Sequence, residues 1–230
     1  MRWPRIPRPR SPEDDPARDR ARMVAEQLEA RGIRDPELLR VFGAVERHRF
    51  VEGDAAYGDH ALPVGSGQTI SQPYVVAMMT GFARPPEGWS GANVLEVGTG
   101  SGYQAAILAE LGARVTTIER HEALAIGARE RLTQAGYADN VEVVVGDGTQ
   151  GWPAHAPYRS VMVTAGAPSV PGPLLEQLDP SGGRLIMPVG NREHQLLTLV
   201  VRDGDELRTE ELEPVVFVPL IGEHGYRPDP

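Results

Sequence analysis

Short apolar runs alternate with amphipathic stretches along the second half of the chain. The apolar runs cover residues 92–97, 114–118, 141–145, 160–164 and 184–189, and helical periodicity fills the intervals that end near residues 111, 135 and 178. Near-continuous apolar strands separated by helices are typical of a parallel sheet that is covered on both faces. The pattern therefore predicts an α/β fold with a doubly wound, mostly parallel sheet.

Turn residues mark the expected ends of these elements. Glycine readily adopts the left-handed conformation that follows a helix. The helices are accordingly expected to end at Gly112, at Gly136 and at the pair Gly182 and Gly183. The Asp-Gly-Asp sequence at residues 203–205 is a turn signal, around which we expect two further strands, at residues 195–202 and 215–220.

The first 80 residues have a different pattern. Residues 1–20 hold five Pro and a basic and then acidic charge pattern, which predicts a disordered tail. Helical periodicity begins around Met23, Val24 and Leu28 and resumes after Asp35, an expected N-cap that Pro36 follows. We therefore expect one domain at residues 21–230, in which a helical segment, 21–80, precedes the core and C-terminal strands, 81–230.

The composition excludes several classes of protein. The 32 acidic residues outnumber the 23 basic ones and leave a net charge of −9, which argues against a nucleic-acid-binding surface. The sequence contains no Lys and no Cys, so a Lys Schiff base, a P-loop Lys and Cys-bound zinc are excluded. No apolar run approaches the ~18 residues of a membrane span, and the first 20 residues lack the apolar region of a signal peptide. We expect a cytoplasmic protein without membrane contact.

A glycine-rich turn follows the first strand of the predicted sheet. VLEVGTGSGY, residues 94–103, places Gly98, Gly100 and Gly102 before a helix that begins near Tyr103. Glycines there let a ligand approach the backbone at the helix N-terminus. The spacing is G-x-G-x-G with Glu96 two residues earlier, whereas dinucleotide sites have G-x-G-x-x-G. The departure disfavours a dehydrogenase.

The next two strands end in acidic residues. Glu119 ends the second strand, where a carboxylate can accept hydrogen bonds from both ribose hydroxyls, and Asp147 follows the third, where it could accept the exocyclic amine of an adenine. The carboxyl ends of parallel strands meet at one edge of the sheet, so these groups and the glycine turn form a nucleoside site. Ordinary loop chemistry is the alternative, and S-adenosylmethionine (SAM) fits the pattern better than a dinucleotide.

The motifs resemble one family of methyltransferases. GQTISQPYVVAMMT at residues 67–80, together with VLEVGTGSGYQAAILA, TIER, GDG, APYRSVMVTAGAP and GGRLIMPVG, resembles the protein-L-isoaspartate O-methyltransferase family from about Met23 to the closing VVFVPLIG. The resemblance implies a Rossmann-like class I methyltransferase fold. It also implies transfer of a methyl group from SAM to the free carboxylate of L-isoaspartyl residues in damaged proteins, releasing S-adenosylhomocysteine (SAH) and initiating repair.

The resemblance also implies roles for particular residues. Ser71 matches the family's active-site serine, beside the sulfonium and the acceptor carboxylate. The cofactor-binding set that the resemblance implies is Thr69, Ile70, Ser71, Glu96, Gly98, Thr99, Gly100, Ser101, Gly102, Glu119, Arg120, Asp147, Gly148 and Gln195. Three positions depart from the family pattern, since Glu46 and Ala61 replace Pro and Gly166 interrupts a run that is more often all Ala. Glu46 and Ala61 lie in the segment that would help to wall the substrate site.

Methyl transfer from a sulfonium to a carboxylate needs no general base, because the nucleophile is ionised near neutral pH. The six His include no HExxH and no close pair, so no metal is expected. Ser71 is therefore interpreted as a hydrogen-bond donor that orients the acceptor. The alternative is that Thr69 and Ser71 cap a helix that begins near Pro73.

Two other functions stay open at this point. A relative could methylate ordinary aspartate in a dedicated peptide, for which Glu46 and Ala61 are the hints, and a non-catalytic module could keep the SAM fold for binding alone. We expect a monomer whose partners are isoaspartyl proteins and peptides. Because an acidic chain repels an acceptor carboxylate, we also expect the mouth near Ser71 to be less acidic than the remaining surface.

Overall fold

The computed structural model describes residues 15–51, 53 and 55–227 and is built around a seven-stranded sheet. Its strand order is β5-β4-β3-β6-β7-β8-β9, in which the pairs from β5 to β7 are parallel and β8 and β9 are antiparallel additions. The strands are β3 (Asn93–Val97), β4 (Arg114–Glu119), β5 (Val141–Val145), β6 (Ser160–Val163), β7 (Ser181–Gly190), β8 (Gln195–Asp203) and β9 (Glu206–Val215). The α/β prediction with a mostly parallel sheet is confirmed.

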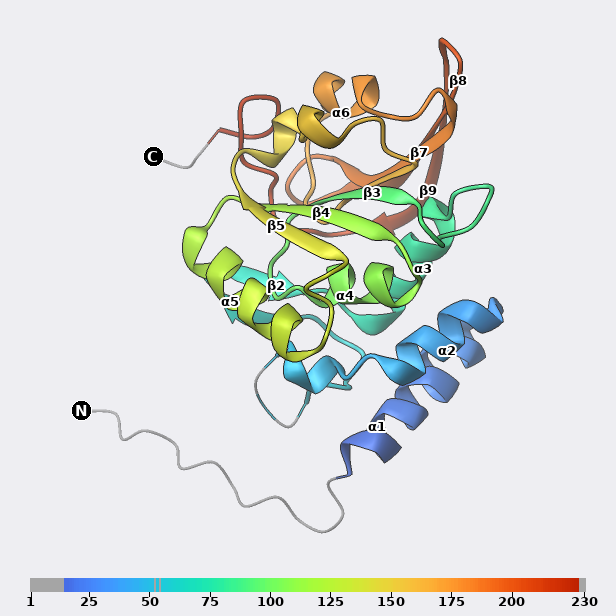
Figure 1. Ribbon diagram of the computed structural model, residues 1–230, viewed down its shortest axis with the longest axis vertical. Helices are drawn as coiled ribbons and strands as arrows, with labels where there is room; N and C mark the ends of the chain where they lie inside the picture. The colour runs from blue at the N-terminus through green and yellow to red at the C-terminus, as the bar shows by residue number, and fades with distance from the viewer. Residues whose placement is uncertain (1–14, 52, 54, 228–230) are drawn as a thin grey trace, which may run out of the picture.

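Helices cover both faces of the sheet, as Figure 1 shows. They are α3 (Pro73–Ala83), α4 (Tyr103–Glu110), α5 (Glu122–Gln134) and α6 (Gly172–Glu176), with short 3-10 turns at Gly148–Gln150 and Pro153–His155. Successive strand side chains point to opposite faces, so Val94 joins the core under α3 and α4 while Leu95 joins the core under α6. Helix α4 is buried almost all round.

The N-terminal segment packs beneath α3 and α4 and holds two helices and a hairpin. It comprises α1 (Pro16–Arg22), a π-helical segment (Met23–Leu28), 3-10 turns (Glu29–Arg31 and Arg47–Arg49), α2 (Pro36–Ala44), β1 (Leu62–Gly65) and β2 (Gln68–Ile70). The expected N-cap of α2 is confirmed, because Asp35 accepts the backbone N–H of Glu37 at 2.9 Å. The antiparallel hairpin of β1 and β2 was not expected in a helical segment.

Part of the predicted tail is ordered. Residues 1–14 lie outside the described residues, but residues 16–20 belong to α1, so the predicted tail extends too far. Asp15 caps this helix by accepting the backbone N–H of Ala17, and Arg20 anchors it through a 2.8 Å hydrogen bond to the carbonyl oxygen of Gly43. Capping and this tertiary contact outweigh the polar composition.

The C-terminal elements differ from the expectation in two places. Gly112 and Gly136 do follow α4 and α5 with positive φ, but Gly182 and Gly183 lie inside β7, because α6 already ends at Glu176. The last strand is β9, Glu206–Val215, and the predicted strand at 215–220 is wrong. Pro219 in that stretch forms only an isolated bridge with Gly166. Strand β9 was missed because its side chains are mostly exposed and charged, so it has no apolar run.

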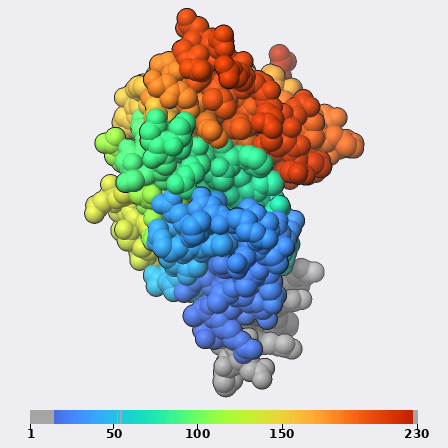
Figure 2. Space-filling model, turned by 90° about the vertical axis from the view of Figure 1, so that its right-hand side faces the viewer, coloured from blue at the N-terminus to red at the C-terminus, as the bar shows by residue number. Residues whose placement is uncertain are grey.

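Figure 2 shows the molecule from the side. The N-terminal elements lie at one end and the C-terminal strands at the other, with the central segment, coloured green, between them. Among the helices of the described residues, none is long and apolar enough to cross a membrane.

Candidate active site

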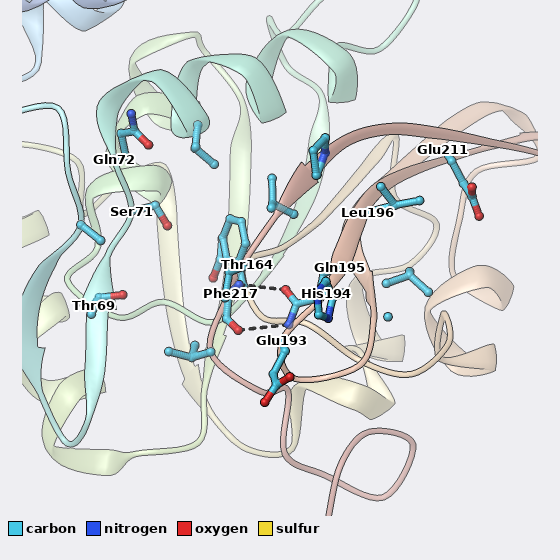
Figure 3. A pocket seen from close by; sticks show the side chains of 18 residues that line it. Thr69, Ser71, Gln72, Thr164, Glu193, His194, Gln195, Leu196, Glu211 and Phe217 are labelled. Atoms are coloured by element: carbon cyan, nitrogen blue, oxygen red, sulfur yellow. Dashed lines mark hydrogen bonds between the residues drawn. The ribbon is translucent and has the colours of Figure 1, made fainter.

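Three adjoining cavities open at the carboxyl ends of the parallel strands. The largest, a cleft of about 1130 Å³, lies between the Thr69–Val75 region and the strands β8 and β9 (Figure 3). Two small cavities, of about 60 and 40 Å³, lie over the glycine-rich turn. Thr69 and Thr164 line all three, so the cavities form one continuous site.

The glycine-rich turn is shaped by positive backbone angles and by Thr164. Gly98, Gly100 and Gly102 have φ values of 96°, 52° and 90°, which L side chains rarely adopt. A Cβ on Gly98 would lie 2.4 Å from the Thr164 hydroxyl, which donates to the carbonyl oxygen of Gly98 at 2.8 Å. Gly98 and Gly100 line both small cavities, whereas Gly102 is the N-cap of α4 and packs against Leu132.

Glu96 carries an unsatisfied oxygen at the 40 Å³ cavity. Its side chain is buried, and its Oε2 accepts a 2.6 Å hydrogen bond from the Thr117 hydroxyl, which also meets the Thr99 hydroxyl at 2.7 Å. Its Oε1 is buried and has no hydrogen-bond partner among the described residues. Burial raises the pKa of Glu96 to about 8, although the Thr117 hydrogen bond lowers it, and the charge of Glu119 adds to the rise. Ser101 and Ile70 line the same cavity.

Glu119 stands at the 60 Å³ cavity, as the sequence predicts. One carboxylate oxygen accepts the backbone N–H of Gly100 at 2.9 Å and the other accepts that of His121 at 3.0 Å. A carboxylate oxygen has a second lone pair, so both remain able to accept from a ribose. Arg120 and Gly148 line this cavity with it.

Asp147 is held by protein groups. Its Oδ1 accepts the backbone N–H of Thr149 at 2.9 Å and the Thr149 hydroxyl at 2.7 Å, and its Oδ2 accepts the backbone N–H of Glu223 at 2.8 Å. Burial tends to raise the pKa of Asp147, but these hydrogen bonds outweigh it and lower the pKa. Asp147 does not line either small cavity, although its neighbour Gly148 does. The sequence pattern located the strand end but not the C-terminal segment that reaches it.

Ser71 lies where the 40 Å³ cavity meets the large cleft. It follows β2 and lines both the 40 Å³ cavity and the large cleft. Helix α3 has Gln72 as its N-cap and no side-chain capping bond, so the interpretation of Ser71 and Thr69 as caps is wrong. Within the described part of the chain, no hydrogen bond engages the Ser71 side chain.

Arg47 supports Ser71 from the protein interior, and sequence reasoning missed it. The guanidinium is fully buried and donates to the carbonyl oxygens of Ala56 and Ser71, each at 2.8 Å, and it lies over the Tyr103 ring at 4.8 Å. Burial lowers the pKa of Arg47. Nothing in a single sequence separates this Arg from the exposed ones around it.

Gln195 lies in the large cleft and lines neither small cavity, so the structure does not place it with the cofactor-binding set. Its side-chain amide pairs with the backbone of Phe217, accepting the N–H at 2.8 Å and donating to the carbonyl oxygen at 3.2 Å (Figure 3). A Cβ on Gly166 would lie 2.5 Å from this amide. The departure at Gly166 thus makes room for Gln195.

The other two departures have different surroundings. Glu46 pairs with Arg20 at 3.7 Å and with Arg49, and it does not line the cleft. Ala61 does line the cleft.

The charges that line the cleft do not support the expectation of a less acidic mouth. Its ionisable side chains are Glu193, His194 and Glu211. No group of three or more His, Cys, Asp or Glu able to hold a metal occurs among residues 15–51, 53 and 55–227.

Comparisons with known proteins identify the family of the chain. Residues 19–225 match the family model described as protein-L-isoaspartate(D-aspartate) O-methyltransferase (PCMT). The protein-L-isoaspartate O-methyltransferase of Methanoregula boonei is 51% identical over 224 residues, which are 96% of this chain and 98% of that protein. Protein-L-isoaspartate O-methyltransferase 2 of Pelobacter propionicus is 54% identical over 209 residues, which are 89% of this chain and 91% of that protein.

Solved structures show the same fold. A protein-L-isoaspartate O-methyltransferase structure superposes with a TM-score of 0.79 at 26% identity and covers 90% of this chain and 67% of that one. A Plasmodium falciparum protein described as a putative member, in complex with SAH, has a TM-score of 0.76 at 22% identity, covers 88% of this chain and 98% of that one, and shows the fold alone. From the family match and the close relatives, this chain belongs to the protein-L-isoaspartate(D-aspartate) O-methyltransferase family of SAM-dependent enzymes.

Proposed function

We propose that the protein transfers a methyl group from SAM to the free carboxylate of L-isoaspartyl residues in damaged proteins, and so initiates their repair. The observation that carries this assignment is the position of Ser71, which lines both the cavity beside the glycine-rich turn and the large cleft. One hydroxyl can therefore face a cofactor on one side and an acceptor on the other.

The residues around the small cavities suit SAM. The unpartnered Oε1 of Glu96 suits the ammonium group of the methionine part, and Glu119 suits the ribose. Gly98, Gly100 and Gly148 leave the backbone open to the ligand. When bound, SAM supplies a methyl group on a positively charged sulfur.

Both small cavities are far below the roughly 300–1000 Å³ of ligand pockets, so the cover must shift for SAM to enter. Gln68 and Thr69 from the hairpin and residues 218–221 from the C-terminal segment form that cover. We assign the role of opening to these two segments.

The chain positions the acceptor and excludes water. The isoaspartyl carboxylate is ionised near neutral pH, so no residue has to remove a proton. Ser71 donates a hydrogen bond to one oxygen of this carboxylate and aims the other at the methyl group, and Arg47 fixes the Ser71 backbone. The 40 Å³ cavity beside Ser71 has room for little water, which limits solvation of the nucleophile at the reacting centre. The proposed transfer requires no metal, and activity should persist with EDTA.

The two alternatives lose support on particular residues. Methylation of ordinary aspartate drew on Glu46 and Ala61, but Glu46 faces Arg20 and Arg49 and leaves only Ala61 in the cleft. A non-catalytic binding module has no use for a Ser71 hydroxyl that makes no bond to a described residue.

Labelled methyl transfer to matched peptides tests the proposal. The peptides differ only in carrying isoaspartate or ordinary aspartate, and we expect methylation of the isoaspartyl peptide. Preference for aspartate would favour the peptide-maturation alternative, and SAH binding without turnover would favour the binding module. The same proposal includes a monomer acting in the cytoplasm, which light scattering and cell fractionation test.

A further inference from the structure

The large cleft is negatively charged along its length. Glu193 and Glu211 line it together with His194, and none of the described Arg residues does. Neither glutamate forms an ion pair within the described part of the chain, whereas Glu206 on the same strand as Glu211 pairs with Arg208 at 3.5 Å. Arg192, next to Glu193, lies instead over the Tyr226 ring at 5.3 Å. The cleft therefore presents two carboxylates that form no ion pair with a cation of the described residues.

The backbone that carries these carboxylates has a defined position. The Asn191 side chain accepts the backbone N–H groups of Glu193 and His194 at 2.9 and 2.7 Å, which fixes the turn between β7 and β8. Glu211 belongs to β9, the edge strand of the sheet. Figure 3 shows Ser71 and Glu211 on opposite sides of the cleft, with His194 and Glu193 below the line that joins them. Because Ser71, Glu193 and Glu211 line one cleft, residues that flank an acceptor carboxylate at Ser71 can come near these glutamates.

The cleft also carries exposed apolar side chains. Val216 is 72% exposed and Leu196 36%, and both line it. Long cationic side chains lay their aliphatic stems on such surfaces and keep the charged head in water. Acidic flanking residues would instead meet like charges.

We propose that this cleft selects isoaspartyl acceptors with Lys or Arg near the damaged residue, their stems on Leu196 and Val216 and their charges facing Glu193 and Glu211. The inference rests on the proposed function and narrows its substrate class. The flanking cation also offsets the repulsion between the acceptor carboxylate and a chain of net charge −9.

Three isoaspartyl peptides that differ only in their flanking residues, Lys, Gln or Glu, test the inference through kcat/KM. Exposed ion pairs contribute about 1.5- to fivefold each. We expect kcat/KM to rise from Glu to Gln to Lys by about this factor per step, and the spread to shrink when salt screens the charges.

Variants locate the selectivity. Glu193→Gln and Glu211→Gln should each reduce the preference for the Lys peptide by about 1.5- to fivefold, and Glu211→Arg should favour the Glu peptide. Glu210→Gln is the matched control, because Glu210 adjoins Glu211 on β9 but does not line the cleft. SAH affinity, measured by calorimetry, should be unchanged in all four variants.

Equal kcat/KM for the three peptides, or an equal effect of Glu210→Gln and Glu211→Gln, overturns this inference and leaves the proposed function standing. Methylation of none of the isoaspartyl peptides overturns the proposed function and this inference with it.

Discussion

The guanidinium of Arg47 donates a 2.8 Å hydrogen bond to the carbonyl oxygen of Ser71 from a fully buried position. The same group also donates to the carbonyl oxygen of Ala56, so it ties the loop after Arg47 to the segment that enters α3. A buried cation is stable only with such partners. The position of the Ser71 backbone is therefore set from inside the protein, and the hydroxyl is left free for a substrate.

Arg47→Lys should loosen this support without removing the positive charge. A Lys ammonium lacks the planar fork that reaches two carbonyl oxygens at once, so one buried acceptor loses its donor at a cost of about 1–3 kcal/mol. We expect lower stability in urea and a fall in kcat that exceeds any change in SAH affinity. Equal loss of kcat and SAH affinity would indicate that Arg47 only maintains the fold.

Ser71→Ala should separate catalysis from binding and from stability. Loss of the orienting hydroxyl should lower methyl transfer by roughly 10- to 100-fold, since misplaced reactants react much more slowly. Because Ser71 caps no helix, the free energy of unfolding should change by less than about 0.5 kcal/mol. A loss near 1 kcal/mol in urea unfolding, with unchanged turnover, would restore the capping interpretation.

Glu96 should make the stability of the cofactor-free protein fall with rising pH. Its pKa is raised from 4.5 to about 8 by burial, so the folded protein binds this proton more tightly than the unfolded chain. The stabilisation is complete below pH 4.5 and is lost as the pH rises through about 8. Glu96→Gln should remove this part of the pH dependence in thermal unfolding between pH 5 and 9, and the exposed control Glu130→Gln should not.

The same carboxyl should couple SAM binding to proton release. Near pH 7 Glu96 holds its proton, and an ammonium group placed against Oε1 favours the charged form, so the proton leaves on binding. Calorimetry at pH 7 in buffers of different ionisation enthalpy should report a release that approaches one proton. Proton release that persists in Glu96→Gln would show that another group is responsible.

The sequence predicted the parts of the fold and site that rest on local patterns. Strands β3, β4 and β6 are buried on both faces and read as apolar runs, and Glu119 follows from its place at a strand end. Strand β9 and the hairpin of β1 and β2 were not predicted, because partly exposed strands do not form continuous apolar runs in the sequence.

Contacts between distant segments could not be read from the chain. The bond from Arg47 to Ser71 spans 24 residues and that from Glu223 to Asp147 spans 76. Gly166 departs from the family pattern, and the Gln195 amide lies where a Cβ at this position would stand. In each case tertiary packing, which one sequence does not display, decides what the residue does.

The bond between Asp147 and the C-terminal segment predicts a cover that can be loosened by one methyl group. A Cβ on Gly222 would lie 2.0 Å from Asp147 Oδ1, so Gly222→Ala should break the hydrogen bond that the Glu223 N–H donates to Asp147. The change should also displace Leu220 and Ile221, which line the 60 Å³ cavity. We expect faster hydrogen exchange at residues 220–226 and weaker SAH binding, by roughly tenfold for one charged hydrogen bond lost. Gly172→Ala is the matched control, since a Cβ there meets nothing within 4 Å. If exchange accelerates while SAH affinity stays the same, the segment covers the cavity without contributing to cofactor binding.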